Sequence, residues 1–221
     1  MATPDVAIVD FALGNLFSIK HACEHVGLDV LITSSAADLE AARSVILPGV
    51  GAFADAMTAL ERLGLVDALR STAASGKPLL GICLGLQLLF SESEEFGVHR
   101  GLDVVPGRVV YFPVQEKDGR RLKVPQVGWN EIHPPEGSGV DVWDGTLLDR
   151  VSPGQPMYFV HSCHVVPEEP GCVLCRADYG DIRFCAGVQL GNVAAFQFHP
   201  ERSGPEGLVV YENFKKMIRQ Q

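Results

Sequence analysis

Cys83 has the clearest potential for nucleophilic chemistry in this sequence. It stands in Gly81-Ile82-Cys83-Leu84-Gly85, after the apolar run Leu79–Ile82 and before a helical pattern. This is the arrangement of a nucleophile elbow, with cysteine in place of serine. The helix N-terminus favours a thiolate, and the backbone N–H of Leu84 is placed to stabilise an oxyanion. The alternative is a buried structural cysteine in an ordinary strand–helix turn.

A candidate base and acid lie near the other end of the chain. The apolar run Ala194–Phe198 leads into His199-Pro200-Glu201. Residues two apart on an extended chain point the same way, and proline biases the residue before it towards an extended conformation. We therefore expect the Glu201 carboxylate to orient the His199 imidazole, as the third member of a catalytic triad does. The alternative is a surface His and Glu in a turn.

A third segment carries the glycine-rich turn Pro48-Gly49-Val50-Gly51, directly after the apolar run Val45–Leu47. A Gly-x-Gly turn exposes backbone N–H groups at low steric cost. A nucleotide-binding loop is disfavoured because the third glycine of G-x-G-x-x-G is missing. We predict an oxyanion loop, in which Gly49, Val50 and Gly51 add donors to that of Leu84.

The elements that must position these residues follow from hydrophobic periodicity. Short apolar runs alternate with helical patterns in the first part of the chain, which predicts a mostly parallel open sheet with helices on both faces. The predicted strands there are Val6–Val9, Val30–Ile32, Val45–Leu47 and Leu79–Ile82, and the helical patterns cover Leu16–Val26, Ala36–Ala42, Met57–Leu60, Leu65–Ala74 and a helix that opens over Leu84–Phe90.

The second part of the chain predicts strands with few helices between them. We expect these strands either to extend the same sheet in antiparallel fashion or to form a side sheet. They are Val109–Phe112, Val127–Ile132, Met157–Val160, Val173–Arg176 and Ala194–Phe198, before a closing amphipathic helix at Leu208–Ile218. The loops are rich in Gly and Pro, and neither a repeat nor a linker interrupts the pattern. We expect one α/β domain over residues 1–221.

Composition restricts the function classes. The chain has 221 residues and a formal net charge of −9, which disfavours nucleic acid and anionic membrane surfaces as partners. No apolar run is long enough to span a bilayer, and the N-terminus lacks the features of a signal peptide. We therefore expect a cytoplasmic protein whose six cysteines are free.

Two other clusters are not expected to form sites. Cys172 and Cys175 have metal-ligand spacing, but residues three apart on a strand face opposite ways and no second pair completes a zinc site. Glu92, Glu94 and Glu95 are most simply a solvated face. We expect no metal and no organic cofactor.

The oxyanion loop, the elbow and the His-Pro-Glu segment together resemble the class I glutamine amidotransferase family, whose motifs occur in the same order. The resemblance covers nearly the whole chain. It implies a flavodoxin-like α/β fold and the hydrolysis of glutamine to glutamate and ammonia through a cysteine thioester, with Cys83, His199 and Glu201 as the catalytic triad.

Further segments resemble the glutaminase subunits of imidazole glycerol phosphate synthases. They are Asp10-Phe11-Ala12-Leu13-Gly14-Asn15-Leu16, Pro125-Gln126-Val127-Gly128-Trp129-Asn130 and Tyr158-Phe159-Val160-His161-Ser162. Those subunits usually have Asp-Tyr-Gly-x-Gly-Asn, Pro-His-Met-Gly-Trp-Asn and His-Ser-Tyr. This sequence departs from them at Phe11, Ala12, Gln126, Val127 and Cys163, and it has Arg202 where lysine is common.

This second resemblance implies roles outside the triad. Residues that would hold glutamine are Gly51, Gln87, His161 and Ser162, and residues at the interface with a cyclase subunit would be Asn15, Trp129, Asn130 and Arg202. The implied heterodimer passes ammonia to the cyclase, which makes imidazole glycerol phosphate and an aminoimidazole carboxamide ribotide in histidine biosynthesis. A half-buried core aromatic is the alternative for Trp129.

Three other functions remain open from the sequence. The chain could serve another synthase, of the anthranilate or pyridoxal phosphate type, although Gly14-Asn15-Leu16 and Gly128-Trp129-Asn130 argue against both. It could be a non-catalytic regulatory subunit, although such a subunit has no need to keep Cys, His and Glu. It could be a free-standing cysteine hydrolase, which copurification of a partner would distinguish.

Overall fold

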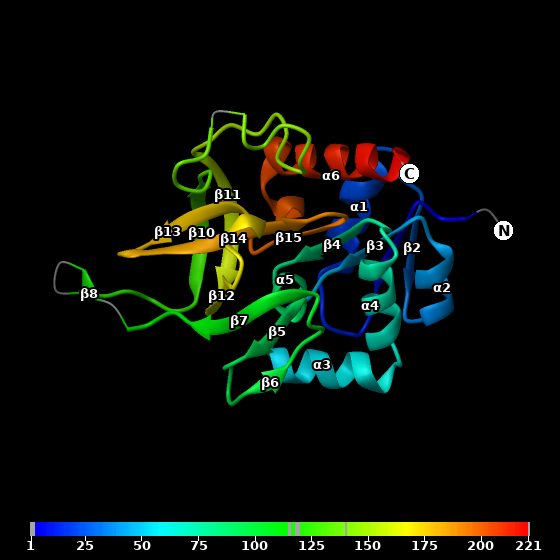
Figure 1. Ribbon diagram of the computed structural model, residues 1–221, viewed down its shortest axis with the longest axis horizontal. Coiled ribbons are helices and arrows are strands. Elements are labelled where there is room, and N and C mark those ends of the chain that lie inside the picture. The colour runs from blue at the N-terminus through cyan, green and yellow to red at the C-terminus, as the bar shows by residue number, and fades with distance from the viewer. Residues whose placement is uncertain (1–2, 115, 118–119, 140, 221) are drawn as a thin grey trace.

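The computed structural model describes residues 3–114, 116–117, 120–139 and 141–220. An eleven-stranded mixed sheet forms the centre of this part of the chain (Figure 1). Its parallel portion has the order β2 (Val30–Thr33), β1 (Val6–Val9), β3 (Ser44–Leu47), β4 (Leu79–Ile82) and β15 (Val193–Phe196). The parallel sheet predicted for the first part of the chain is confirmed.

Helices cover both faces of this parallel portion, because each buried strand sends alternate side chains to opposite faces. Ala7 and Val9 belong to one hydrophobic core and Val6 and Ile8 to the other. The first core is closed by α2 (Ala36–Ala41), α3 (Phe53–Arg62), α4 (Val66–Ala74) and the short α5 (Leu84–Leu88), and the second by α1 (Leu16–His25) and α6 (Gly204–Arg219).

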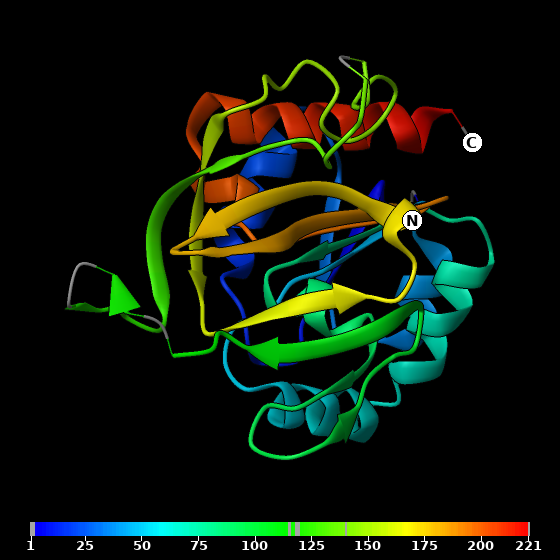
Figure 2. The same ribbon diagram turned by 60° about the vertical axis from the view of Figure 1, so that its left-hand side comes forward.

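Beyond β15 the same sheet continues with strands that pair antiparallel, except that β5 (Phe90–Ser93) and β7 (Val105–Tyr111) are parallel (Figure 2). The order there is β14 (Ile182–Leu190), β12 (Cys163–Pro167), β7, β5 and β6 (His99–Arg100), and β13 (Val173–Tyr179) also pairs with β14. Two hairpins stand outside this sheet, β10 (Gln126–Ile132) with β11 (Gln155–His161) and β8 (Glu116–Lys117) with β9 (Arg120–Arg121). Two 3₁₀ turns are η1 (Pro170–Cys172) and η2 (Pro200–Arg202).

Several sequence predictions differ from the structure. The run Ala194–Phe198, grouped with the antiparallel strands, forms β15, which pairs parallel with β4 on one side and antiparallel with β14 on the other. The helix predicted to run from Leu84 to Phe90 ends at Leu88, because Phe90 begins strand β5. Strand β14 was not predicted. Its central residues Phe184–Val188 are all buried, so it shows none of the alternation that marks a half-exposed strand.

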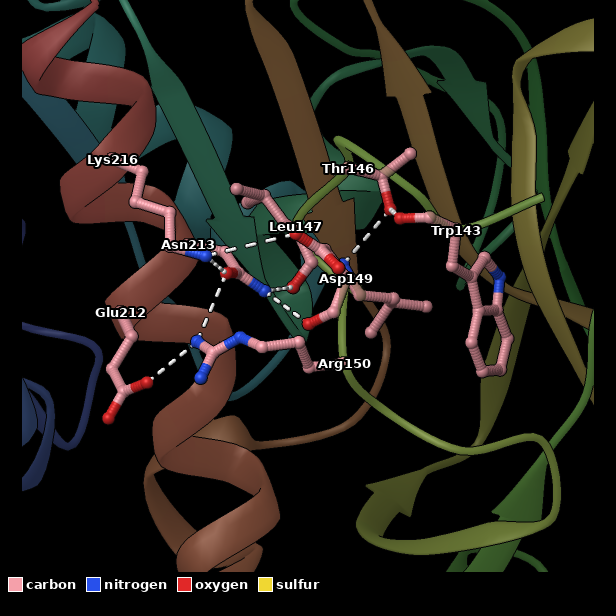
Figure 3. Close-up of polar contacts among 9 residues, drawn as sticks. Trp143, Thr146, Leu147, Asp149, Arg150, Glu212, Asn213 and Lys216 are labelled. Atoms are coloured by element: carbon pink, nitrogen blue, oxygen red, sulfur yellow. Dashed lines mark hydrogen bonds and ion pairs between the residues drawn. The ribbon is translucent and has the colours of Figure 1, made fainter. Parts of the chain in front are cut away.

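The loop between β10 and β11 is fastened to α6 by polar contacts (Figure 3). The buried Asn213 side chain donates to the carbonyls of Leu147 and Asp149 at 3.2 and 2.7 Å, and Arg150 pairs with Glu212 at 2.7 Å. These contacts hold α6 in place directly after η2. None of the helices in the described ranges is long and apolar enough to cross a membrane.

Candidate active site

The turn between β4 and α5 holds Cys83 in a strained conformation. Its φ of +56° lies in the region that disfavours a side chain, as in a nucleophile elbow. The flanking glycines are required by close packing. A Cβ on Gly85 would lie 1.8 Å from the carbonyl oxygen of Leu47, and one on Gly81 would lie 2.8 Å from the Cβ of Ala195. Helix α5 has only five residues, so the helix-dipole contribution expected from the sequence is small.

Strand pairing brings the predicted base to the predicted nucleophile. Strands β4 and β15 are parallel neighbours with Ile82 opposite Phe196, and the Cys83 N–H donates to the Phe196 carbonyl at 2.8 Å. His199 follows Phe196 by three residues and therefore emerges at the same end of the sheet. The carboxyl ends of parallel strands are where open α/β sheets place their sites.

His199 and Glu201 form a buried pair. His199 Nδ1 lies 2.8 Å from Glu201 Oε1, and the two side chains are 5% and 0% exposed. His199 Nε2 has no hydrogen-bond partner among the described residues. Burial lowers the pKa of His199, but its interactions with Cys83 and Glu201 outweigh burial and raise that pKa to about 10. The imidazole is therefore a cation at neutral pH, which can donate a proton to a leaving group.

The glycine-rich loop approaches the elbow with a carbonyl group. The Leu84 N–H, predicted as an oxyanion donor, donates to the Gly49 carbonyl oxygen at 3.4 Å. Gly51 has a φ of +103°, a conformation that only glycine adopts readily. In this conformation of the loop, the Leu84 donor is occupied by the protein itself.

A cavity of about 250 Å³ opens over Cys83. All four residues predicted to hold glutamine line it, namely Gly51, Gln87, His161 and Ser162. Val50, Leu84 and Cys163 line it as well. The structure thus brings together segments that are more than one hundred residues apart in the sequence.

Glu95 belongs to this cavity, contrary to the expectation that it forms part of a solvated face. Its Oε2 accepts a hydrogen bond from the Phe53 N–H at 2.6 Å, and its Oε1 lies 3.9 Å from the Cys163 sulfur. Glu92 and Glu94 are exposed as predicted. Glu95 differs because the chain turns after β5 and directs this carboxylate inward, which spacing within an acidic run does not indicate.

Gln197 is a second residue that the sequence analysis missed. Its side chain is fully buried and its Nε2 lies 3.8 Å from the Cys83 sulfur. Its Oε1 accepts a hydrogen bond from Gln87 Nε2 at 3.0 Å. Gln197 stands two residues before His199, and the same alternation that pairs His199 with Glu201 could have identified it.

His161 is held among aromatic rings. Its centroid lies 5.2 Å from those of Phe112 and Phe184 and 5.6 Å from that of Phe159, and its Nδ1 lies 2.8 Å from the Cys163 carbonyl oxygen. Burial lowers the pKa of His161 to about 4, so the ring is neutral at physiological pH. Gln126 lies opposite His161 in the β10–β11 hairpin and is also buried.

The remaining thiols have the character of structural cysteines. Burial raises the pKa of Cys23, Cys163 and Cys185 to about 12. Cys172 and Cys175 belong to different hydrophobic cores, on opposite sides of the sheet. That arrangement agrees with the prediction that these two face opposite ways.

The residues predicted at a partner interface lie at the start of α1, on β10 and in the turn η2. Arg202 lies over the Tyr158 ring at 4.3 Å from its centroid, and Trp129, which is 58% exposed, meets the same ring edge-on at 6.0 Å between centroids. Asn15 is exposed at the start of α1. Asn130 follows Trp129 on the strand and points the other way, where its side chain donates to the Asp178 carbonyl at 2.6 Å.

Sequence comparison finds close relatives over the full length of this chain. The sequence profile of "Glutamine amidotransferase class-I" matches residues 7–217. The imidazole glycerol phosphate synthase subunit HisH of Moorella thermoacetica is 45% identical over 214 residues, which are 97% of this chain and 95% of that protein. The HisH subunit of Aquifex aeolicus is 43% identical and covers 95% of each chain.

Solved structures share the fold at low sequence identity. The structure of PurLQS from Thermotoga maritima has a TM-score of 0.69 at 19% identity and covers 97% of this chain and 99% of that one. The glutaminase domain of Trypanosoma brucei CTPS, solved with bound acivicin, has a TM-score of 0.69 at 18% identity and covers 99% of this chain and 95% of that one. The match to the family profile and the relatives at 43–45% identity establish that the chain belongs to the class I glutamine amidotransferase family, in the group formed by the HisH subunits of imidazole glycerol phosphate synthase.

Proposed function

We propose that this chain hydrolyses the side-chain amide of glutamine and that Cys83, His199 and Glu201 carry out the reaction. The observation that carries the proposal is the buried His199–Glu201 pair, 2.8 Å apart, beside a cysteine held at positive φ under a cavity. A nucleophile, a base and an orienting carboxylate in this order are the components of acyl transfer through a covalent intermediate.

The steps of glutamine hydrolysis follow from the protonation states of the three catalytic side chains. The Cys83 sulfur attacks the amide carbon and forms a C–S bond, and His199 gives its proton to the nitrogen as the C–N bond breaks and ammonia leaves. Neutral His199 then takes a proton from water, whose oxygen attacks the thioester carbon. The C–S bond breaks, glutamate is released, and the Cys83 thiolate and the His199 cation are regenerated. Glu201 holds the imidazole in place throughout. In a rotated loop that turns the Gly49 carbonyl away from Leu84, backbone N–H groups of Leu84 and of the Gly49–Gly51 loop stabilise the oxyanion in both halves.

The cavity offers two acceptors for the α-ammonium group of glutamine. Both N–H groups of the Gln87 amide are used within the protein, by the Cys163 carbonyl at 3.2 Å and by Gln197 Oε1 at 3.0 Å. Gln87 therefore contributes its Oε1 to a ligand. The Glu95 carboxylate adds a negative charge on the same cavity. We propose that these two groups select an amino acid over a simple amide, because only the amino acid carries the cation.

Ammonia at neutral pH is mostly ammonium, which is not nucleophilic, so a glutaminase of this kind is useful when a synthase takes the ammonia directly. We propose that the partner is a cyclase subunit and that the product pair is imidazole glycerol phosphate and an aminoimidazole carboxamide ribotide. The names of the relatives support this choice over an anthranilate or pyridoxal phosphate synthase. The chain acts as one domain, with the exposed Trp129 and Arg202 at the interface.

Replacement of the nucleophile tests the proposal. Cys83→Ala should lower glutamate release by about 10⁴-fold, because the covalent route is lost. The complex of that variant with the cyclase should still make product from ammonium salt. Cys172→Ala is the matched control, since Cys172 is buried in the 3₁₀ turn η1 outside the cavity and should leave turnover unchanged. Glutamine turnover retained by Cys83→Ala would show the assignment to be wrong.

A further inference from the structure

We infer that Gln197 is a positioning residue for the reacting sulfur, with its amide N–H directed at Cys83 and its orientation determined by Gln87. The inference deepens the proposed function and rests on Cys83 being the nucleophile. Gln197 Nε2 lies 3.8 Å from Cys83 Sγ, within reach of an N–H···S hydrogen bond, and Gln197 is fully buried.

The orientation of the two amides follows from a backbone carbonyl group. The Cys163 carbonyl oxygen can only accept, so the Gln87 atom 3.2 Å away must be its nitrogen. The same nitrogen lies 3.0 Å from the terminal group of Gln197, which must then present its oxygen. Gln197 therefore has its nitrogen on the side of Cys83. Neither amide can rotate by half a turn without placing two donors or two acceptors against each other.

The Cys83 sulfur has a second polar contact, with a backbone carbonyl group, and this contact determines what the Gln197 N–H contributes. Cys83 Sγ also lies 3.8 Å from the Val160 carbonyl oxygen. A thiol can donate its proton to that carbonyl, whereas a thiolate faces the carbonyl without a proton to donate. The Gln197 N–H has the opposite preference, because a donor is stabilised by a full negative charge on its acceptor. Gln197 thus offsets Val160 in favour of the thiolate.

Charged and titratable groups around the sulfur act in both directions. The His199 cation favours the thiolate, and Glu201 behind it holds that cation in place. Glu95 lines the same cavity and opposes a second negative charge there. His161 is neutral at physiological pH and adds no charge. Helix α5, behind the elbow, has only five residues, so its dipole contributes little to stabilising a thiolate. Among the described side chains, the Gln197 amide is the neutral donor directed at the sulfur.

Alkylation of Cys83 by iodoacetamide over a range of pH tests this role in the full chain, because this small neutral reagent needs no glutamine site. In Gln197→Leu the pH midpoint of the Cys83 alkylation rate should move up by about one unit. At pH values below that midpoint the rate should fall about tenfold, as expected for the loss of one hydrogen bond to a charged group. Gln197→Met, which keeps an unbranched side chain, serves the same purpose if leucine disturbs the packing.

The matched control is Gln189→Leu. Gln189 accepts a hydrogen bond from the Leu147 N–H at the far end of β14 and does not contact the elbow. Its alkylation profile should equal that of the unmodified protein. An unchanged profile in Gln197→Leu, with Cys83 still the labelled residue, would overturn the inference and leave the proposed function intact. Labelling of other cysteines in preference to Cys83 in the unmodified protein would overturn the proposed function itself.

Discussion

At the scale of single residues, this site depends on an unfavourable backbone conformation and on a buried pair of charges. A non-glycine residue at positive φ costs about 1–2 kcal/mol, and Cys83 is held there by the close contacts of Gly81 and Gly85. The His199–Glu201 pair is buried where charges are costly unless they are paired. Such local costs are typical of functional sites, because the surrounding packing must supply the free energy that maintains them.

His161 provides a prediction about stability and pH. Its pKa is about 4 in the folded protein against an ordinary value of 6.5. Below pH 6.5 the unfolded chain binds a proton that the folded protein does not, so the free energy of unfolding falls as the pH falls towards 4. Between pH 7.5 and 5 this residue should account for a loss of about 2 kcal/mol.

Urea unfolding of the unmodified chain and of His161→Gln at both pH values checks this prediction. The variant should lose about 2 kcal/mol less than the unmodified protein over that interval, because glutamine does not titrate. His164, whose pKa burial also lowers, is present in both proteins and its effect cancels. The same loss of stability in the two proteins would mean that His161 is not buried as a neutral ring.

At the scale of elements, two strand–helix junctions and one strand end build the site. Strands β3, β4 and β15 are neighbours in the sheet, and each ends in one of the three motifs: the Gly49–Gly51 loop, the Cys83 elbow and the His199–Glu201 segment. Because the strands are parallel, their carboxyl ends meet at one edge. The motifs are therefore brought together by the topology of the sheet.

The loop after β3 leads to a prediction about control. The Leu84 N–H is hydrogen-bonded to the Gly49 carbonyl oxygen at 3.4 Å, so this conformation lacks a donor that the oxyanion needs. Loss of one such donor costs about 10²–10³ in rate. We expect the isolated chain to be a poor glutaminase. We also expect the cyclase, with its acceptor substrate bound, to favour a rotated loop by about 3–4 kcal/mol, which corresponds to the same factor.

The rate of steady-state glutamate release tests whether the loop after β3 changes conformation when the partner binds. It is measured for the chain alone, for the complex with the cyclase, and for the complex with an acceptor ligand. The turnover number should rise from the first to the last by about 10²–10³. Complexes made with Cys83→Ala give the background of each measurement. Equal turnover in all three states would exclude gating by the loop, though not the triad.

At the scale of the whole molecule, the outer surface beside the site carries aromatic and cationic groups suited to a protein partner. Trp129 and Tyr158 lie edge to face, and Arg202 stacks on Tyr158. Exposed Phe17 on α1 adds apolar surface, and α1 contacts the 3₁₀ turn that contains Arg202. Trp, Tyr and Arg are the residues that most often dominate the free energy of protein–protein binding.

Trp129→Ala should therefore weaken the complex with the cyclase by about 2 kcal/mol or more. The fold should change little, because the Trp129 side chain is 58% exposed in the isolated chain. Titration calorimetry of the two subunits measures the change in affinity. Phe96→Ala is the matched control, since Phe96 is 82% exposed on the β5–β6 turn, away from the Trp129–Tyr158–Arg202 stack. An equal effect of both substitutions, or none for Trp129, would place the interface elsewhere.

The sequence alone determined the parallel core of the fold and the order of the chemical motifs. Strands Val6–Val9 and Leu79–Ile82 are apolar throughout because both faces of the sheet are covered, and their bounds were predicted correctly. The glycines of the elbow and the alternation of His199 with Glu201 are local patterns, which depend on backbone geometry over a few residues. Such patterns can be recognised without knowing what lies nearby.

The tertiary structure decided which residues far apart in the sequence come into contact. Glu95 lines the cavity because β5 pairs with β7 and turns its end inward, and Gln197 reaches Cys83 because β15 lies beside β4. The contact of the Gly49 carbonyl with Leu84 and the hydrogen bond from Asn130 to the Asp178 carbonyl also depend on how the strands are placed and on which side chains face which way. Long-range packing decides these contacts, since the residues involved carry no local signature of their partners.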